Sequence, residues 1–282
     1  MTRTGYGSMI EFTVSEHGGQ LISLTKDGKE YICSGTPYWA YSAPVLFPIV
    51  GRLKNDSYRL GEKVYTLKQH GFARNRDFIC TDDEPLTYRL AYDDDTLKSY
   101  PFKFVLTTSY RPINNELIIT SRVQNPSEDD IWFSLGAHPA LKVPFDGGRF
   151  EDYLLYFECE EHAKRIPLTK DGLLSRNRVD FLNGRTVQLN YDLFKDDALV
   201  FENLKSRRIS IRHGNKAVTV RADNVPYWGI WTKPGAPFLC IEPWCGHADF
   251  EDFDGDFTQK PGILSLEAGK SFSMQYSILI DA

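Results

Sequence analysis

The chain has 282 residues, of which 41% are hydrophobic and 25% are charged, and its formal net charge is −5. This length is sufficient for a large core, and large all-β folds reach it as a single domain. No cluster of Lys and Arg suggests nucleic acid as a partner, and no apolar run reaches the about 20 residues that a membrane span needs. Five cysteines without an apolar signal segment are typical of a reducing compartment. We therefore expect a cytoplasmic protein with neither nucleic acid nor membrane as a partner.

A regular pattern begins only at Met9. From there to Leu24 apolar and polar residues alternate, interrupted by His17-Gly18-Gly19, which predicts two strands joined by a tight turn. We expect residues 1–8 to be a flexible tail or a remnant of an expression vector, and residues 9–282 to form one domain. The aromatic stretch Pro37–Ala43 is predicted to form a single helical turn.

Two polar side chains emerge from buried segments in the first third of the chain. Pro44–Asn55 is apolar, and its prolines exclude a central strand or a long helix. Arg52 lies near its end, directed either at a defined site or at solvent. A hairpin predicted at Tyr58–Leu67 leads to His70, which is followed by a glycine and a bulky Phe. His70 is therefore a candidate for a pocket mouth, although a lone His is more often a structural hydrogen-bonding group.

Short strands dominate the remainder of the chain. Glu116–Val123 shows the pattern most clearly, because its odd positions share one face and its even positions the other. Similar patterns predict strands at Tyr88–Tyr92, Phe102–Tyr110, Ile131–Leu135, Tyr153–Cys159, Thr186–Leu189, Ala198–Phe201, Ile209–Ile211, Val218–Val220 and Phe272–Ile280. No helix longer than two turns is predicted. The sequence therefore predicts an all-β fold, a single-domain antiparallel sandwich.

The stretch Phe238–Phe250 carries the strongest indication of chemistry. Phe238–Ile241 is an apolar run that predicts a buried strand, and Glu242 stands where the run stops, directly before Pro243-Trp244. A carboxylate beside aromatic and proline surface loses water, which raises its pKa and makes it a better proton acceptor. The alternative is a strand-end carboxylate that turns into solvent.

No motif indicates a metal centre or a nucleotide site. Cys240, Cys245 and His247 have a spacing that matches no known zinc pattern. The chain also lacks a glycine-rich phosphate loop and a G-x-S-x-G nucleophile motif. We predict that chelators leave the activity unchanged.

Four short motifs, in this order, resemble the aldose 1-epimerase (galactose mutarotase-like) superfamily: Phe47–Arg52, His70–Phe72, Gly136–Pro139 and Ile241–Trp244. The resemblance extends over nearly the whole chain and is nearest to the bacterial LacX-like branch. It implies a β-supersandwich with a groove across one sheet, no metal and no organic cofactor. The implied partner is a small-molecule sugar, and we expect a monomer or a homodimer.

The resemblance also implies roles for individual residues. His138, at a strand end between Ala137 and Pro139, would be the general acid, and Glu242 the general base. The residues that it assigns to sugar hydroxyls are Arg52, His70 and Asp197. Asp197 is chosen over Asp196 because it directly precedes an apolar strand. Trp228 is added to the groove from its aromatic surroundings alone.

The function that we expect is interconversion of the α and β anomers of a free hexose. A hexose 6-phosphate is the alternative substrate, because His70–Arg74 also resembles hexose-6-phosphate epimerases, in which an Arg in this region binds phosphate. Arg52 and Arg74 together could hold such a group. Two further alternatives stay open. One is a sugar-binding protein without catalysis. The other is a retaining glycosidase, for which Asp197 and Glu242 are the only obvious carboxylate pair.

Overall fold

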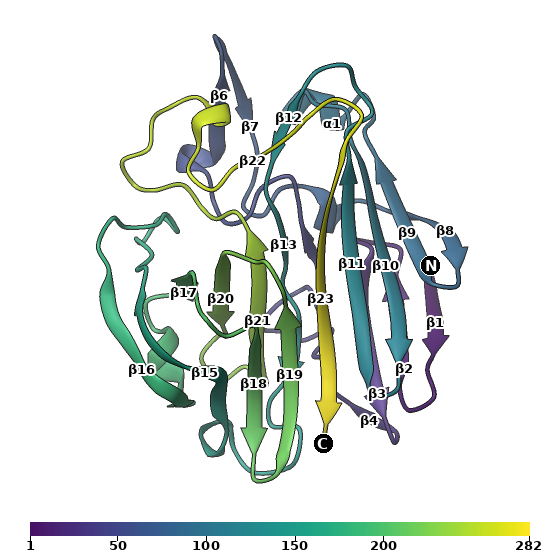
Figure 1. Ribbon diagram of the computed structural model, residues 1–282, viewed down its shortest axis with the longest axis vertical. Coiled ribbons are helices and arrows are strands. Elements are labelled where there is room, and N and C mark those ends of the chain that lie inside the picture. The colour runs from purple at the N-terminus through teal and green to yellow at the C-terminus, as the bar shows by residue number, and fades with distance from the viewer.

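The structure, a computed structural model, describes residues 1–282 and consists almost entirely of antiparallel strands (Figure 1). The all-β antiparallel sandwich predicted from the sequence is confirmed. No helix in the protein is long and apolar enough to cross a membrane. The strands are β1 (Thr2–Tyr6), β2 (Glu11–Ser15), β3 (Gln20–Lys26), β4 (Lys29–Glu30), β5 (Val45–Leu46), β6 (Ser57–Leu60), β7 (Lys63–Thr66), β8 (Ile79–Asp83), β9 (Leu86–Ala91), β10 (Val105–Ile113), β11 (Glu116–Gln124), β12 (Ile131–Phe133), β13 (Leu135–Ala137), β14 (Ala140–Lys142), β15 (Leu154–Arg165), β16 (Val179–Gln188), β17 (Leu199–Glu202), β18 (Arg208–His213), β19 (Lys216–Ala222), β20 (Tyr227–Trp231), β21 (Phe238–Cys245), β22 (Leu264–Leu266) and β23 (Ser271–Asp281).

Helical structure is limited to short turns between strands. The one α-helical turn is α1 (Thr96–Ser99). The 3-10 turns are Lys54–Asp56, Ala73–Asn75, Phe150–Asp152, Tyr191–Phe194 and Phe257–Gln259. The helical turn predicted at Pro37–Ala43 does not form, and that stretch is a loop closed by a bridge between Thr36 and Trp39.

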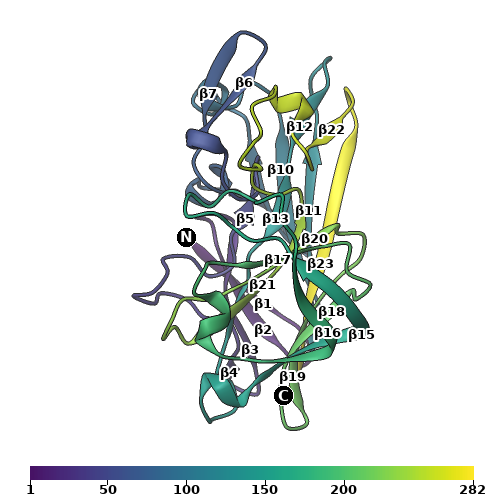
Figure 2. The same ribbon diagram turned by 90° about the vertical axis from the view of Figure 1, so that its left-hand side faces the viewer.

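Three sheets build the sandwich. The largest has nine strands in the order β16-β15-β18-β19-β23-β11-β10-β9-β8 and spans the view in Figure 1. Two smaller sheets pack against one face of this large sheet (Figure 2). One has six strands, in the order β17-β20-β21-β13-β5 with β14 also paired to β21, and the other has four, in the order β1-β2-β3-β4. The hairpin β6-β7 and the pair β12-β22 are separate two-stranded ribbons at one end.

One continuous core joins these layers. It contains 58 buried residues drawn from all three sheets, which explains why residues far apart in the chain depend on one another for burial. Phe12 of β2 stacks on Tyr110 of β10 with ring centroids 6.2 Å apart, which joins the four-stranded sheet to the large one. The rings of Phe157 in β15 and Phe201 in β17 pack with centroids 6.3 Å apart, which joins the six-stranded sheet to the nine-stranded one.

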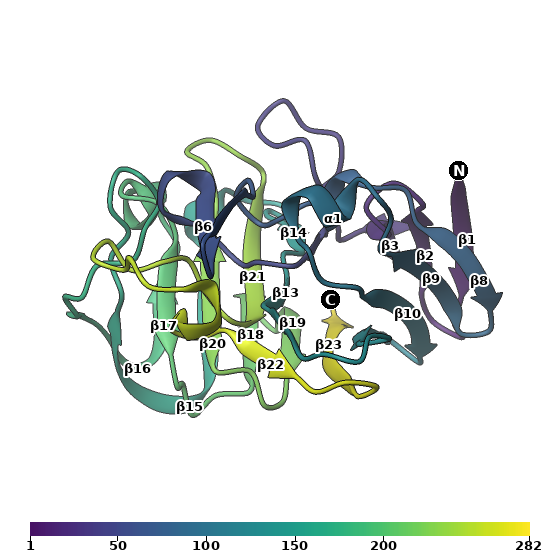
Figure 3. The same cartoon turned by 90° about the horizontal axis from the view of Figure 1, so that it is seen from above.

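The N-terminal residues do not form the flexible tail that the sequence suggested. Residues 2–6 form β1, which pairs in full with β2 and lies near β8 at the edge seen in Figure 3. Arg3 forms an ion pair with Asp83 of β8 at 2.6 Å. At Gly5 a Cβ atom would lie 2.3 Å from the ring of Phe12, so glycine is what allows close approach. Because β1 is an edge strand with little buried surface, its sequence shows no apolar alternation.

A buried ion pair anchors the loop that follows β21. The ammonium of Lys260 has no solvent exposure, lies 2.6 Å from the carbonyl oxygen of His247, and is 3.4 Å from the Asp249 carboxylate. Asp249 in turn accepts a hydrogen bond from the Lys54 N–H at 2.9 Å, and its own N–H donates to the Arg52 carbonyl at 2.9 Å. Lys260 therefore holds this loop against the segment that follows Gly51.

Replacing Lys260 with Met should lower the free energy of unfolding by about 3–5 kcal/mol, because Asp249 would be left as a buried charge without a partner. Denaturation in urea measures this loss. The double variant Lys260→Met, Asp249→Asn should recover part of it, since Asn can still accept the Lys54 hydrogen bond without carrying charge. Equal losses in the single and double variants would show that the ion pair is not what stabilises the loop.

Candidate active site

Strand β21 lies in the middle of the six-stranded sheet and is buried at every position. Its side chains alternate between two faces. Leu239, Ile241 and Cys245 belong to the main core, whereas the side chains on the opposite face, Phe238, Cys240 and Trp244, belong to two smaller clusters. Glu242 lies on this second face, between Cys240 and Trp244. The polar residue at the end of the predicted apolar run is therefore inside the protein, only 1% exposed, and not in solvent.

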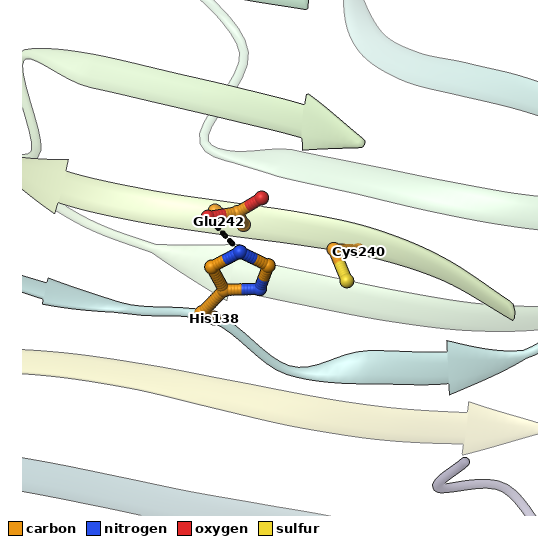
Figure 4. Close-up of side chains that lie close together, drawn as sticks. All are labelled: His138, Cys240 and Glu242. Atoms are coloured by element: carbon orange, nitrogen blue, oxygen red, sulfur yellow. Dashed lines mark ion pairs between the residues drawn. The ribbon is translucent and has the colours of Figure 1, made fainter. Parts of the chain in front are cut away.

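The neighbouring strands place His138 against this carboxyl. Strands β13 and β14 both pair with β21, and the register that joins Gly136 to Trp244 and Ala140 to Cys240 puts His138 directly opposite Glu242. Pro139 has no N–H to donate, so the strand pairing is interrupted between β13 and β14. The imidazole of His138 lies over the sheet at this interruption. The Nε2 atom of His138 lies 3.2 Å from Oε2 of Glu242 (Figure 4).

Small residues keep space for the bulky Trp244 beside this pair. Gly229 of β20 is the partner of Glu242, and a Cβ there would lie 2.4 Å from the Trp244 ring. A Cβ at Gly136 would lie 2.8 Å from the same indole. A side chain at either position would therefore displace the indole.

His70 reaches the site through two loops that lie side by side. Its N–H donates to the Gly51 carbonyl at 2.8 Å, and its Nδ1 accepts from the Gly51 N–H at 3.1 Å. An Nδ1 that accepts a hydrogen bond leaves the proton of a neutral ring on Nε2, so His70 has a donor to offer. The next residue, Gly71, has φ of 69°, and a Cβ there would meet the Phe47 carbonyl oxygen at 2.3 Å. His70 and His138 meet edge to face, with centroids 5.5 Å apart.

Two cations line the same cavity. Arg74 donates to the Gln69 carbonyl at 2.8 Å and lies over the Tyr41 ring, 4.6 Å from its centroid. Its Nε atom is buried without a hydrogen-bond partner. Lys233 lies on the exposed side of the cavity. Neither cation forms an ion pair with a carboxylate in this structure.

Asp197 is the carboxylate of the Asp196-Asp197 pair that faces the cavity. It adopts φ of 85° and accepts a hydrogen bond from the Ala198 N–H at 2.8 Å, which turns its side chain back toward the start of β17. Asp196 instead points to Arg165, 4.0 Å away. The choice of Asp197 over its neighbour therefore agrees with the geometry.

Aromatic side chains form one wall. Trp39 stacks on the His138 ring with centroids 4.5 Å apart, and Trp231 meets the same imidazole edge to face at 5.7 Å. These two tryptophans cover two sides of the His138 ring. Neither was selected from the sequence. The cluster of aromatic residues in Pro37–Ala43 was the available signal for Trp39.

The cavity has a volume of about 330 Å³ and brings together five of the residues selected from the sequence. These are His70, Arg74, His138, Asp197 and Glu242. Arg52 lies beside the cavity, where its guanidinium contacts Asp56 at 3.3 Å and the Asp171 carbonyl at 3.3 Å. The assignment of Trp228 to the groove is corrected, because this side chain is 2% exposed and packs in the main core. Positions alternate along β20, so Trp231 faces the cavity and Trp228 faces away from it.

Burial shifts the pKa values of the central pair in opposite directions. Loss of water raises the pKa of Glu242 well above its usual range, and the nearby Asp197 charge raises it further, while the Trp244 indole opposes the shift. Burial lowers the pKa of His138 to about 3, assisted by the positive charge of Arg74. Burial likewise lowers the pKa of His70. At neutral pH burial therefore favours the uncharged forms of these groups.

Burial also raises the pKa of Asp197, although the residue keeps more than a third of its surface exposed. The Ala198 N–H, the Trp231 indole and the charge of Arg52 oppose this shift. Arg52 is thus close enough to the cavity mouth to influence a group inside it.

Glu242→Gln should stabilise the protein increasingly as the pH rises. The folded pKa of Glu242 is raised, so its contribution to stability is fully present below about pH 4.3 and is lost as the pH rises toward the folded pKa. The amide of Gln does not ionise, so the variant does not lose stability in this way as the pH rises. The difference in unfolding free energy between the variant and the wild type should therefore grow by about 1.4 kcal/mol per pH unit in that window. Urea denaturation from pH 5 upward measures it, and parallel pH profiles would contradict the raised pKa.

Comparisons with known proteins agree with this arrangement. The family model for aldose 1-epimerase matches residues 5–278. The plasmid-encoded protein LacX of Lactococcus lactis subsp. lactis is 33% identical over 281 residues, which cover 93% of this chain and 94% of LacX. The crystal structure of a galactose mutarotase related enzyme from Lactobacillus acidophilus is 37% identical with a TM-score of 0.95, covering 100% of this chain and 98% of its own.

A second crystal structure, of a galactose mutarotase-like protein from Lactobacillus casei ATCC 334, is 28% identical with a TM-score of 0.93 and covers 99% of this chain and 100% of its own. These matches extend over nearly the whole sandwich and include the strands that carry His138 and Glu242. The resemblance inferred from the four motifs is confirmed. The chain belongs to the aldose 1-epimerase family.

Proposed function

We propose that this protein is a mutarotase that interconverts the α and β anomers of a free hexose by acid–base catalysis. The observation that carries the proposal is the contact between His138 and Glu242 at 3.2 Å, on the wall of a cavity lined by hydroxyl-binding groups. The cavity volume of about 330 Å³ lies at the small end of ligand sites, which suits a single sugar ring.

Anomer exchange requires two proton transfers at neighbouring atoms of the sugar. A base removes the proton from the hydroxyl on C1 while an acid protonates the ring oxygen, and the ring opens to an aldehyde. Rotation about the C1–C2 bond presents the other face of the carbonyl, and both transfers then reverse as the ring closes. The two sugar oxygens are bonded to the same carbon, so an acid and a base in mutual contact can serve both.

Glu242 would be the base and His138 the acid. In the protein without sugar, burial favours the protonated carboxyl of Glu242 and the neutral ring of His138. Transfer of this proton across the 3.2 Å contact yields the carboxylate and the imidazolium that ring opening needs. The one proton exchanged between Glu242 and His138 is therefore sufficient for the reaction, and none is taken from solvent.

The remaining polar groups would hold the sugar. His70 offers an Nε2–H donor fixed by its contact with Gly51, and Asp197 offers a carboxylate that accepts from hydroxyls. Arg52 would have to turn from Asp56 toward the cavity mouth to reach a hydroxyl. The indole of Trp39 presents a flat apolar surface for the C–H face of the ring.

Glu242→Gln should reduce the rate of anomer exchange by at least about 100-fold, because general acid–base groups contribute about 100- to 10,000-fold each. NMR exchange spectroscopy with glucose and galactose measures the rate. Glu161→Gln is a matched control, since Glu161 is also buried but accepts from the Ser206 N–H outside the cavity. Activity of Glu242→Gln within about tenfold of the control would exclude Glu242 as the base.

A hexose 6-phosphate is the second candidate substrate. Arg74 and Lys233 both line the cavity, and neither has a carboxylate partner. Two uncompensated cations favour an anionic group on the ligand. We rank the free sugar first because the Gln69 carbonyl and the Tyr41 ring already hold Arg74 in place.

Arg74→Ala distinguishes the two substrates. If the substrate is a 6-phosphate, the lost contact is worth about 1.5–3 kcal/mol, so kcat/KM for the phosphosugar should fall by about 10- to 200-fold. With a free hexose as substrate, kcat/KM should change little. Arg76→Ala is the control, because Arg76 lies two residues away and pairs with Asp93 and Asp95 outside the cavity. A wild-type preference for the 6-phosphate that disappears only in Arg74→Ala would overturn the free-hexose proposal.

A further inference from the structure

The catalytic pair has a third neighbour that the proposed reaction does not use. Cys240 is two residues before Glu242 on β21, so both side chains lie on the same face of the strand, beside the His138 ring (Figure 4). One potential ligand atom from each of these three side chains lies within 4.8 Å of the other two. All three residues are buried, and Cys240 has no exposed surface.

This cluster has the composition of a site for a soft divalent cation. A thiolate, an imidazole and a carboxylate are all zinc ligands, and the thiolate disfavours magnesium and calcium. Tetrahedral zinc, with bonds of about 2.0–2.3 Å, keeps neighbouring ligand atoms about 3.3–3.7 Å apart. The 3.2 Å between His138 Nε2 and Glu242 Oε2 is already close to this spacing, and the outer limit of 4.8 Å for the three ligand atoms exceeds it by only about 1 Å.

Two further features point to a ligand at this place. Oε2 of Glu242, the oxygen that faces His138, is buried and has no hydrogen-bond partner, which is unusual for a polar atom inside a protein. Both residues also line the cavity, so an ion can reach them from solvent and a water molecule can complete its coordination. Three protein ligands with one position left open are a common zinc arrangement.

We propose that His138, Cys240 and Glu242 form a binding site for zinc or a similar soft divalent ion, and that occupancy of this site inhibits the enzyme. Binding forms bonds from the metal to sulfur, nitrogen and oxygen, and releases the thiol proton of Cys240 and the carboxyl proton of Glu242 to solvent. No electron is transferred. The ion is an inhibitor and not a cofactor, because it occupies both the base and the acid.

The inhibition rests on the proposed function, whereas the site itself does not. Binding is therefore tested first by a readout that is independent of activity. Titration of the full-length protein with Co²⁺ should produce an absorption band from charge transfer between thiolate and cobalt, together with the visible bands of tetrahedral cobalt. Zinc should displace the cobalt and remove both.

The variant Cys240→Ala should lose the charge-transfer band. Cys245→Ala is the matched control, because Cys245 is buried on the same strand but faces the main core. Cys240→Ser serves as a second variant if Ala impairs folding, since it keeps the size of the side chain and removes the thiolate. No band in the wild type, or a band that persists in both Cys240 variants, would overturn the proposal.

Inhibition is then measured by anomer exchange at increasing zinc concentration, with EDTA to reverse it. Cys240→Ala should keep the activity of the metal-free enzyme and need at least about tenfold more zinc for half inhibition, because even groups outside the ligand sphere change metal affinity by about 10- to 100-fold. Zinc that binds without inhibiting, or that activates, would overturn the inhibitory role. A cobalt band in a protein inactive on every sugar would refute the proposed function and leave the metal site standing.

Discussion

The contact between Glu242 and His138 inside an apolar sheet is the constraint on which the rest of the site depends. A carboxyl group in the centre of β21 is costly to ionise, so burial favours its protonated form, and burial likewise favours the neutral form of the adjacent imidazole. The two groups lie 3.2 Å apart, and no other ion pair involves either of them. In the mechanism that we propose, the arrival of sugar hydroxyls moves one proton across this 3.2 Å contact.

The surrounding structure keeps this pair in place and keeps the space beside it open. Gly136 and Gly229 make room for the Trp244 indole, and the stacked ring of Trp39 covers His138. The buried Lys260 also holds the loop after β21 against the segment near Gly51, whose backbone N–H donates to His70. Elements from the first quarter and the last fifth of the chain thus meet at one cavity, and the single large core makes their alignment cooperative.

The same chemistry that suits proton transfer also suits metal binding. An unprotonated imidazole and a carboxyl without hydrogen-bond partners are poised for a proton, and beside the Cys240 thiol they are equally suited to a soft cation. Under the inhibition that we propose, the enzyme is active only when free zinc is scarce. The cations Arg74 and Lys233 also line the cavity.

The sequence alone determined the fold class, the family and most of the polar residues of the site. Alternating strands, closely spaced turns and four ordered motifs are local properties, readable without knowing which strands pair. The direction of each side chain is not local, because one step along a strand reverses its face. Pairing therefore decided that Trp231 faces the cavity and Trp228 the core, that His138 lies opposite Glu242, and that Cys240 joins them. It also turned an unpatterned N-terminus into an edge strand, since an edge needs a partner's hydrogen bonds more than it needs apolar residues.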